Sequence, residues 1–172
     1  GMENLPYRAA KDLLMKRPPR LTSPVRKRLI GDGDDVVGGS IRIAAEMKSS
    51  ILGIQGRRGS GKTYTGAMMI LNLARQGKRI GVTAPSHKVI LNVFQKMLEL
   101  SVQHNIPVSI IHKAKDGEDL PPGIEKAKDS KHALNALNER KVVGGTAWLW
   151  AHNDAREVLD YLFVDEAGQM SL

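Results

Sequence analysis

The sequence of 172 residues contains no cysteine and few aromatic side chains. The absence of cysteine excludes disulfides, thiolate catalysis and zinc or iron–sulfur sites with cysteine ligands. With two tryptophans, three tyrosines and two phenylalanines, the core must be mainly aliphatic and platforms for base stacking must be few. No apolar run approaches the ~20 residues that a membrane-spanning helix needs, and the polar, basic N-terminus shows no secretory signal. We therefore expect a cytoplasmic protein without a membrane partner.

Acidic residues are missing from one long stretch in the middle of the chain. Residues 47–97 include no aspartate or glutamate but nine lysines and arginines, and the whole chain carries a net charge of +8. Such a region produces a positive field that favours a polyanion, either a nucleotide or a nucleic acid. A solvated basic face that only aids solubility is the alternative, and charge alone does not decide between the two.

Hydrophobic periodicity divides the chain into a basic N-terminal helix and arm, residues 1–39, and a longer part, residues 40–172. In the longer part, strands alternate with helices, which indicates βαβ units with right-handed crossovers. The expected fold class is therefore α/β, with a parallel sheet that has helices on both faces. Strands are predicted at residues 51–55, 79–83, 107–111, 141–143 and 161–164, helices at residues 7–16, 40–47, 63–76, 86–100, 131–139 and 154–159, and an exposed excursion at residues 113–131.

A glycine-rich loop, GRRGSGKT at residues 56–63, matches the pattern G-x-x-x-x-G-K-S/T at all of its fixed positions. Gly59 and Gly61 permit backbone angles that are closed to other residues, so that several N–H groups can point at one phosphate. Lys62 is predicted to reach the β- and γ-phosphates of ATP, and the Thr63 hydroxyl to bind Mg²⁺. The predicted nucleotide site comprises Gly56, Gly59, Ser60, Gly61, Lys62 and Thr63.

Two adjacent carboxylates follow the last predicted strand. Ligands of an open parallel sheet bind beyond the carboxyl ends of its strands, so Asp165 and Glu166 are expected near the glycine-rich loop. Asp165 is predicted to hold Mg²⁺, and Glu166 to orient or deprotonate the attacking water. Gln169 is a weaker candidate for sensing the γ-phosphate or the water. A solvated acidic turn is the alternative.

Together with two further stretches, these residues resemble the first motor domain of a superfamily 1 helicase. The resemblance is closest to the group with a D-E-A-G/A-Q box, which includes the RNA-surveillance and Okazaki-fragment-processing helicases. Residues 56–63 match motif I and residues 165–169 match motif II. Residues 83–90 resemble motif Ia, and residues 143–147 resemble a motif that contacts the nucleic-acid backbone. Bacterial proteins that join a RecB-like nuclease region to such a helicase are also similar, although no nuclease motif is visible here.

The resemblance implies a RecA-like P-loop ATPase domain that couples Mg-ATP hydrolysis to movement along single-stranded DNA or RNA. The resemblance also implies that Ala84, Pro85, Ser86 and Thr146 contact the single-stranded nucleic acid. Without the resemblance, Ser86 is interpreted as a helix N-cap and Thr146 as a turn residue. In the family, motif III and a second motor domain with an arginine finger follow motif II. We therefore expect a fragment that needs this second domain in cis and hydrolyses ATP weakly or not at all by itself.

Two other functions stay open on the sequence alone. A small P-loop kinase would need an acceptor pocket and a lid arginine, whereas the glutamate that follows Asp165 favours a hydrolase. A nucleotide-gated nucleic-acid-binding module without turnover is the other alternative. The alternation of Trp148 and Trp150 predicts one buried and one exposed ring, with packing favoured over base stacking. The five histidines show no metal-ligand spacing, so surface or packing roles are expected.

Overall fold

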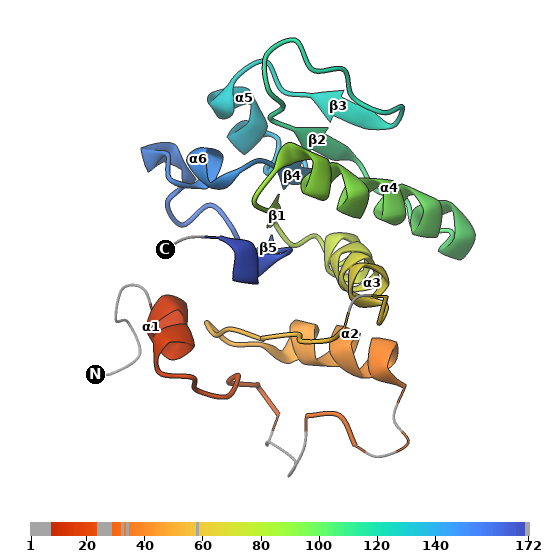
Figure 1. Ribbon diagram of the computed structural model, residues 1–172, viewed down its shortest axis with the longest axis vertical. Helices are drawn as coiled ribbons and strands as arrows, with labels where there is room; N and C mark the ends of the chain where they lie inside the picture. Colours follow the sequence, from red (N-terminus) through yellow and green to blue (C-terminus); the bar gives the residue numbers. More distant parts are fainter. Residues whose placement is uncertain (1–7, 24–28, 32, 34, 58, 171–172) are drawn as a thin grey trace. The chain divides into compact units, whose positions relative to one another are not determined.

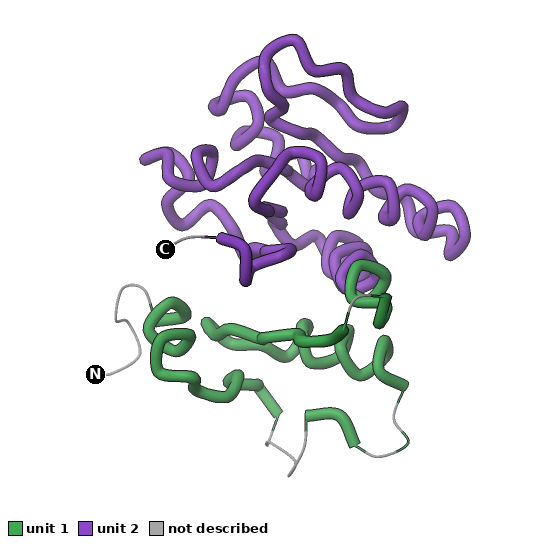
Figure 2. The backbone as a smooth tube through the Cα atoms, in the orientation of Figure 1, with its two compact units in different colours: residues 1–65 green, residues 66–172 purple. Residues whose placement is uncertain are grey.

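The computed structural model describes residues 8–23, 29–31, 33, 35–57 and 59–170. The chain forms two compact units, residues 1–65 and residues 66–172, which are described separately (Figure 2). The boundary falls inside helix α3 (Lys62–Arg75), the helix that follows the glycine-rich loop. None of the described helices combines the length and the apolar character that crossing a membrane requires.

The described part of unit 1 contains helices α1 (Arg8–Leu14) and α2 (Val36–Glu46) and the first turn of α3. The N-cap of α2 is Asp35, whose carboxylate accepts hydrogen bonds from the backbone N–H groups of Val37 and Gly38 at 3.2 and 2.8 Å. These bonds satisfy donors that have no partner inside the helix, which explains why the helix starts there.

The strand predicted at residues 51–55 is wrong, because this segment has no regular secondary structure. A strand needs a backbone partner, and the described part of unit 1 contains only one isolated antiparallel bridge, between Leu21 and Met47. Ile54 is accordingly half-exposed, at 44%. The apolar residues of this segment therefore do not build a strand by themselves.

Five parallel strands form the sheet of unit 2, in the order β3–β2–β4–β1–β5 (Figure 1). This architecture confirms the predicted α/β fold class and is consistent with a RecA-like P-loop domain. The strands are β1 (Ile80–Thr83), β2 (Ile110–His112), β3 (Ile124–Lys126), β4 (Val142–Gly144) and β5 (Tyr161–Val164).

Strand β3 lies in the segment that was expected to be an exposed excursion. Ile124 is only 8% exposed and pairs with Ile110 of β2. The other two residues of β3, Glu125 and Lys126, are exposed, so the strand carries a single apolar side chain. Such a short edge strand has no hydrophobic pattern that sequence reasoning can detect.

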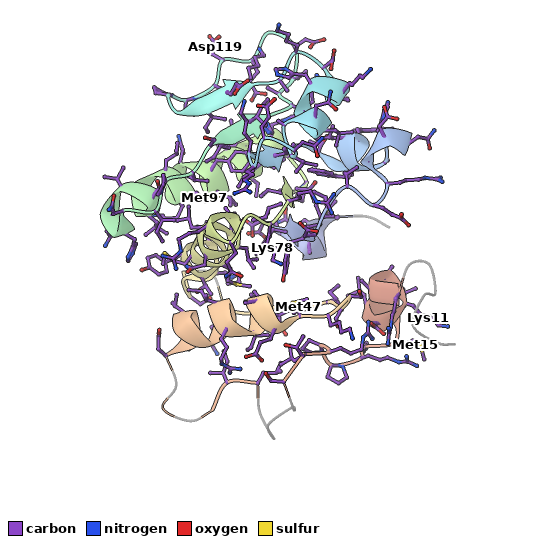
Figure 3. All side chains as sticks on the ribbon, turned by 180° about the vertical axis from the view of Figure 1, so that it is seen from behind. Lys11, Met15, Met47, Lys78, Met97 and Asp119 are labelled. Carbon is purple, nitrogen blue, oxygen red and sulfur yellow. The ribbon has the colours of Figure 1, made fainter. Side chains whose placement is uncertain are left out.

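Helices cover both faces of this sheet. α4 (His87–His104) and the part of α3 in unit 2 lie on one side, and α5 (Ser130–Asn135) and α6 (Ala147–Trp150) lie on the other (Figure 1). Met97 of α4, labelled in Figure 3, is completely buried. Phe94 is the only phenylalanine, tyrosine or tryptophan in the buried core of the described residues, which agrees with the expected aliphatic core.

Glycines in the sheet allow the helices to pack closely on it. A Cβ atom on Gly144 would lie 2.4 Å from the ring of Phe94 in α4. On the opposite face, a Cβ atom on Gly81 would lie 2.7 Å from the ring of Trp150 in α6. Any larger residue at either position would therefore push a helix away from the sheet.

The helix predicted at residues 154–159 is also wrong. Its place is taken by a single 3₁₀ turn, η1 (Asn153–Ala155), and the unpredicted helix α6 precedes it. Glu157 has a φ of +57°, which a right-handed helix cannot accommodate. The chain therefore leaves the helical conformation before it enters β5.

Candidate functional site

The glycine-rich loop lies in unit 1 and leads into the first turn of α3. Gly59 and Gly61 have φ angles of +79° and +82°, the left-handed region that the motif was expected to require. Lys62 is the first residue of α3, and its ammonium donates hydrogen bonds to the carbonyl oxygens of Gly56 and Arg57 at 2.7 and 3.0 Å. The positive charge is therefore held against the backbone of the loop itself.

Other residues of the loop make it compact. A Cβ atom on Gly56 would lie 2.4 Å from Oγ of Ser60, so a side chain there would displace the Ser60 hydroxyl. Thr63 is half-buried in the first turn of α3, and the N–H of Thr65 donates to the carbonyl of Gly61 at 2.9 Å. The loop thus combines left-handed glycines, a lysine and the N-terminus of a 14-residue helix, a combination that suits a phosphate group.

The acidic pair lies in unit 2, directly after β5. The N–H of Asp165 donates to the carbonyl of Thr83 at 2.9 Å, which ties this turn to the neighbouring strand β1. Glu166 has a φ of +49°, which is rare for any residue except glycine, and its N–H donates to the Asp165 carboxylate at 3.0 Å. Such backbone strain is concentrated at functional sites, so the turn is a candidate on structural grounds as well.

Gln169 belongs to the same turn as the acidic pair. Its side-chain amide donates a hydrogen bond to the Glu166 carboxylate at 3.1 Å. The structure thus brings together two of the residues that were predicted to act on the attacking water. Both side chains are exposed, so they are accessible to a ligand.

The residues that were expected to contact single-stranded nucleic acid lie at the carboxyl ends of the β-strands β1 and β4, beside the acidic pair. The N–H of Gly145 donates to the carbonyl of Val82 at 3.1 Å, which joins the loops after the two strands. Ala84 is buried, with 1% of the whole residue exposed, whereas Pro85 and Ser86 are exposed.

Two of these residues also occupy helix N-cap positions. The Ser86 hydroxyl accepts a hydrogen bond from the N–H of Val89 at 3.4 Å and so caps α4, as its structural interpretation predicted. Thr146 precedes α6 and is half-buried, but its hydroxyl makes no capping hydrogen bond. The Thr146 side chain is therefore not required to start α6.

The two tryptophans of α6 differ in exposure, as their alternation predicted. Trp150 is half-buried, and its Nε1–H donates to the carbonyl of Gly145 at 3.0 Å. Trp148 is 87% exposed. Packing explains Trp150, but it does not explain Trp148.

A histidine pair at the same edge of the sheet was not predicted. His112, the last residue of β2, is completely buried, and its Nε2 lies 3.0 Å from Nδ1 of His87, the first residue of α4. Burial, with a smaller contribution from His87, lowers the pKa of His112 to about 4, so that its ring is neutral at pH 7. The ring of Phe94 packs edge-on against it. This packing role agrees with the expectation for the histidines.

Comparison with known proteins places this arrangement in a family. The family model described as the helicase domain of the RNA cytidine acetyltransferase NAT10/TcmA matches residues 53–172. The chain belongs to the NAT10/TcmA helicase-domain family. The matched range of this NAT10/TcmA helicase domain contains the glycine-rich loop, the acidic pair and all five strands.

One curated relative is also described as a helicase. The DNA replication ATP-dependent helicase/nuclease DNA2 of Saccharomyces cerevisiae is 28% identical over 125 residues. The match covers 69% of this chain but only 8% of the length of the yeast protein. No solved structure matches the chain significantly. The chain is thus a P-loop helicase-like domain at the level of the superfamily.

Proposed function

We propose that this chain is the ATP-binding part of a superfamily 1 motor of the D-E-A-G/A-Q group, which couples Mg-ATP hydrolysis to movement on single-stranded nucleic acid. The observation that carries the proposal is the glycine-rich loop, in which two left-handed glycines precede a lysine at the start of α3. Membership in a helicase-domain family supports an ATPase activity of the parent protein.

The residues present fit a nucleotide with Mg²⁺. Lys62 and the N–H groups near Gly59 and Gly61 would bind the phosphates. The Thr63 hydroxyl and the Asp165 carboxylate are oxygen ligands of the kind that Mg²⁺ prefers, and the ion would neutralise charge on the phosphates. No group of three or more histidine, aspartate or glutamate side chains suited to a metal occurs in the described part of the chain, and Mg²⁺ held largely by phosphates and water needs none.

Glu166 is assigned to the attacking water. Its exposed carboxylate accepts the proton of the water, and Gln169, which already donates to that carboxylate, keeps it oriented. The single-stranded nucleic acid would contact Pro85, Ser86 and Thr146. An arginine finger from a second motor domain would complete the site, which is why hydrolysis by this chain alone should be slow.

The first test separates nucleotide binding from hydrolysis. Lys62→Ala should abolish binding of a fluorescent ATP analogue to the full chain, whereas Lys78→Ala, at an exposed lysine after α3 (Figure 3), should not. Equal binding by the parent and the Lys62→Ala variant would refute the assignment of the loop.

The second test measures ATP hydrolysis by the complete gene product with and without single-stranded DNA or RNA. We expect single-stranded DNA or RNA to stimulate ATP hydrolysis. A Glu166→Gln variant should still bind ATP but lose this stimulated hydrolysis. The stimulation would also identify the strand on which the motor moves. Phosphate transfer to a small acceptor without stimulation would favour the kinase alternative instead. Strand binding without any turnover would favour a nucleic-acid-binding module.

A further inference from the structure

Trp148 has no role in the site described above, yet it is the most exposed large hydrophobic side chain in the described residues. Aromatic side chains normally bury about 150–250 Å² each, so an indole left in water is unusual. We propose that Trp148 is a stacking platform for a base of the single strand, immediately beside the contact assigned to Thr146. This inference rests on the proposed function and adds to it a residue that touches the bases.

The backbone that presents the ring is firmly seated. Leu149 is 3% exposed, and a Cβ atom on Gly145 would lie 2.4 Å from its side chain. Trp150 adds the hydrogen bond from its Nε1–H to the carbonyl of Gly145. Leu149 and Trp150, the two residues that follow Trp148 in α6, are thus held in place, while Trp148 projects into solvent. A platform on a fixed backbone loses little further entropy when it binds a base.

The surroundings of Trp148 suit a polyanion that also carries bases. The loop after β2, the strand next to β4, begins with Lys113, whose N–H donates to the carbonyl of Gly144 at 2.8 Å. The acidic pair follows β5, which is separated from β4 by β1. Stacking on an aromatic ring beside cations that attract phosphates is how proteins bind single strands without reading their sequence.

A protein partner fits the surroundings less well. The exposed residues that directly follow α6 are Ala151, His152, Asn153 and Asp154, and all of them except the small Ala151 are polar. Along the helix, the ring is therefore an isolated aromatic group and not part of a continuous apolar stripe. A single ring can cover one base completely, whereas it offers little area to a protein.

The test compares the binding of a mixed-sequence oligonucleotide, as DNA and as RNA, to the full chain and its variants. Trp148→Ala should weaken binding about tenfold, and Trp148→Phe should retain most of the affinity. Val102→Ala is the matched control, since Val102 is 84% exposed but lies at the opposite end of α4 from the strand-contact residues. Its affinity should equal that of the parent.

Three readouts distinguish stacking from other contacts. On an abasic strand of the same length, the difference between the parent and Trp148→Ala should vanish. The dependence of affinity on salt should be unchanged in Trp148→Ala, because the ring contacts no phosphate. In a Trp150→Phe background, Trp148 is the sole tryptophan, and its fluorescence should be quenched by a normal strand.

The proposal is overturned if Trp148→Ala binds the normal strand as tightly as the parent does, or if it loses affinity equally on the abasic strand. It is also overturned if the emission of Trp148 shifts to shorter wavelength with rising protein concentration alone, because a second copy of the chain would then cover the ring. A parent chain that binds no strand, even at low salt, would instead refute the proposed function itself.

Discussion

Acidification is expected to weaken the core of unit 2 at one residue, His112. Burial of its ring, assisted by His87 and to a smaller degree by Lys113, lowers its pKa from 6.5 to about 4, against small opposing effects of the Gly144 carbonyl and Glu118. Below pH 6.5 the His112 imidazole therefore binds a proton in the unfolded chain, whereas in the folded chain it stays neutral until about pH 4. The stability due to the neutral ring is complete above pH 6.5 and is lost as the pH falls towards 4.

The size of this effect follows from the two pKa values. The full difference corresponds to about 3 kcal/mol, of which about 2 kcal/mol is reached at pH 5. The assay is urea unfolding at pH 7.5 and pH 5, followed by circular dichroism, for the parent, His112→Gln and the control His104→Gln. His104 is exposed at the end of α4.

The quantity compared is the loss of unfolding free energy between the two pH values within each protein. His112→Gln should lose about 2 kcal/mol less than the parent, whatever its own stability at pH 7.5, because it has no imidazole to protonate. His104→Gln should behave like the parent. An equal loss in His112→Gln and the parent would show that the buried imidazole is not what makes the fold acid-sensitive.

Further predictions concern packing and capping. Gly144→Ala should cost about 1–3 kcal/mol in urea unfolding, because its Cβ atom would overlap Phe94 and His112. Gly66→Ala, in helix α3 with nothing within 4 Å of the added atom, should instead stabilise by about 0.5–1 kcal/mol; destabilisation by both would contradict the packing described for Gly144. Asp129→Ala should lower the free energy of unfolding by about 1 kcal/mol, since the carboxylate caps α5 through the N–H of His132 at 2.7 Å. Asp129→Asn should retain most of that stability, and a loss as large as that of the alanine variant would mean that the cap is not the cause.

The parallel sheet could be predicted because β1, β4 and β5 are apolar segments separated by helical ones. Features that depend on a partner distant in the sequence could not be predicted. Residues 51–55 are as apolar as a strand but have no neighbouring strand within the described part of their own unit. Conversely, β3 forms from a mostly charged segment because β2 offers it a free edge.

The same distinction holds for the candidate site. The left-handed angles of Gly59 and Gly61 follow from the local motif, and so they were predicted correctly. The strained backbone of Glu166 and its bond to Gln169 depend on how the turn after β5 is tied to β1. His87 and His112 are 25 residues apart in the sequence, and no local sequence pattern predicts their contact.

The order of the strands has a consequence for folding while the chain is being synthesised on the ribosome. β1 lies between β4 and β5, and Gly81 pairs with Val143 and Leu162. At about 5–20 residues per second, several seconds pass before either partner has been synthesised. β2 and β3, which are much closer in sequence, are the first strands that can pair. The nascent chain therefore leaves the apolar β1 unpaired until β4 has been synthesised. During this interval a chaperone would have the largest effect, by shielding β1 from aggregation.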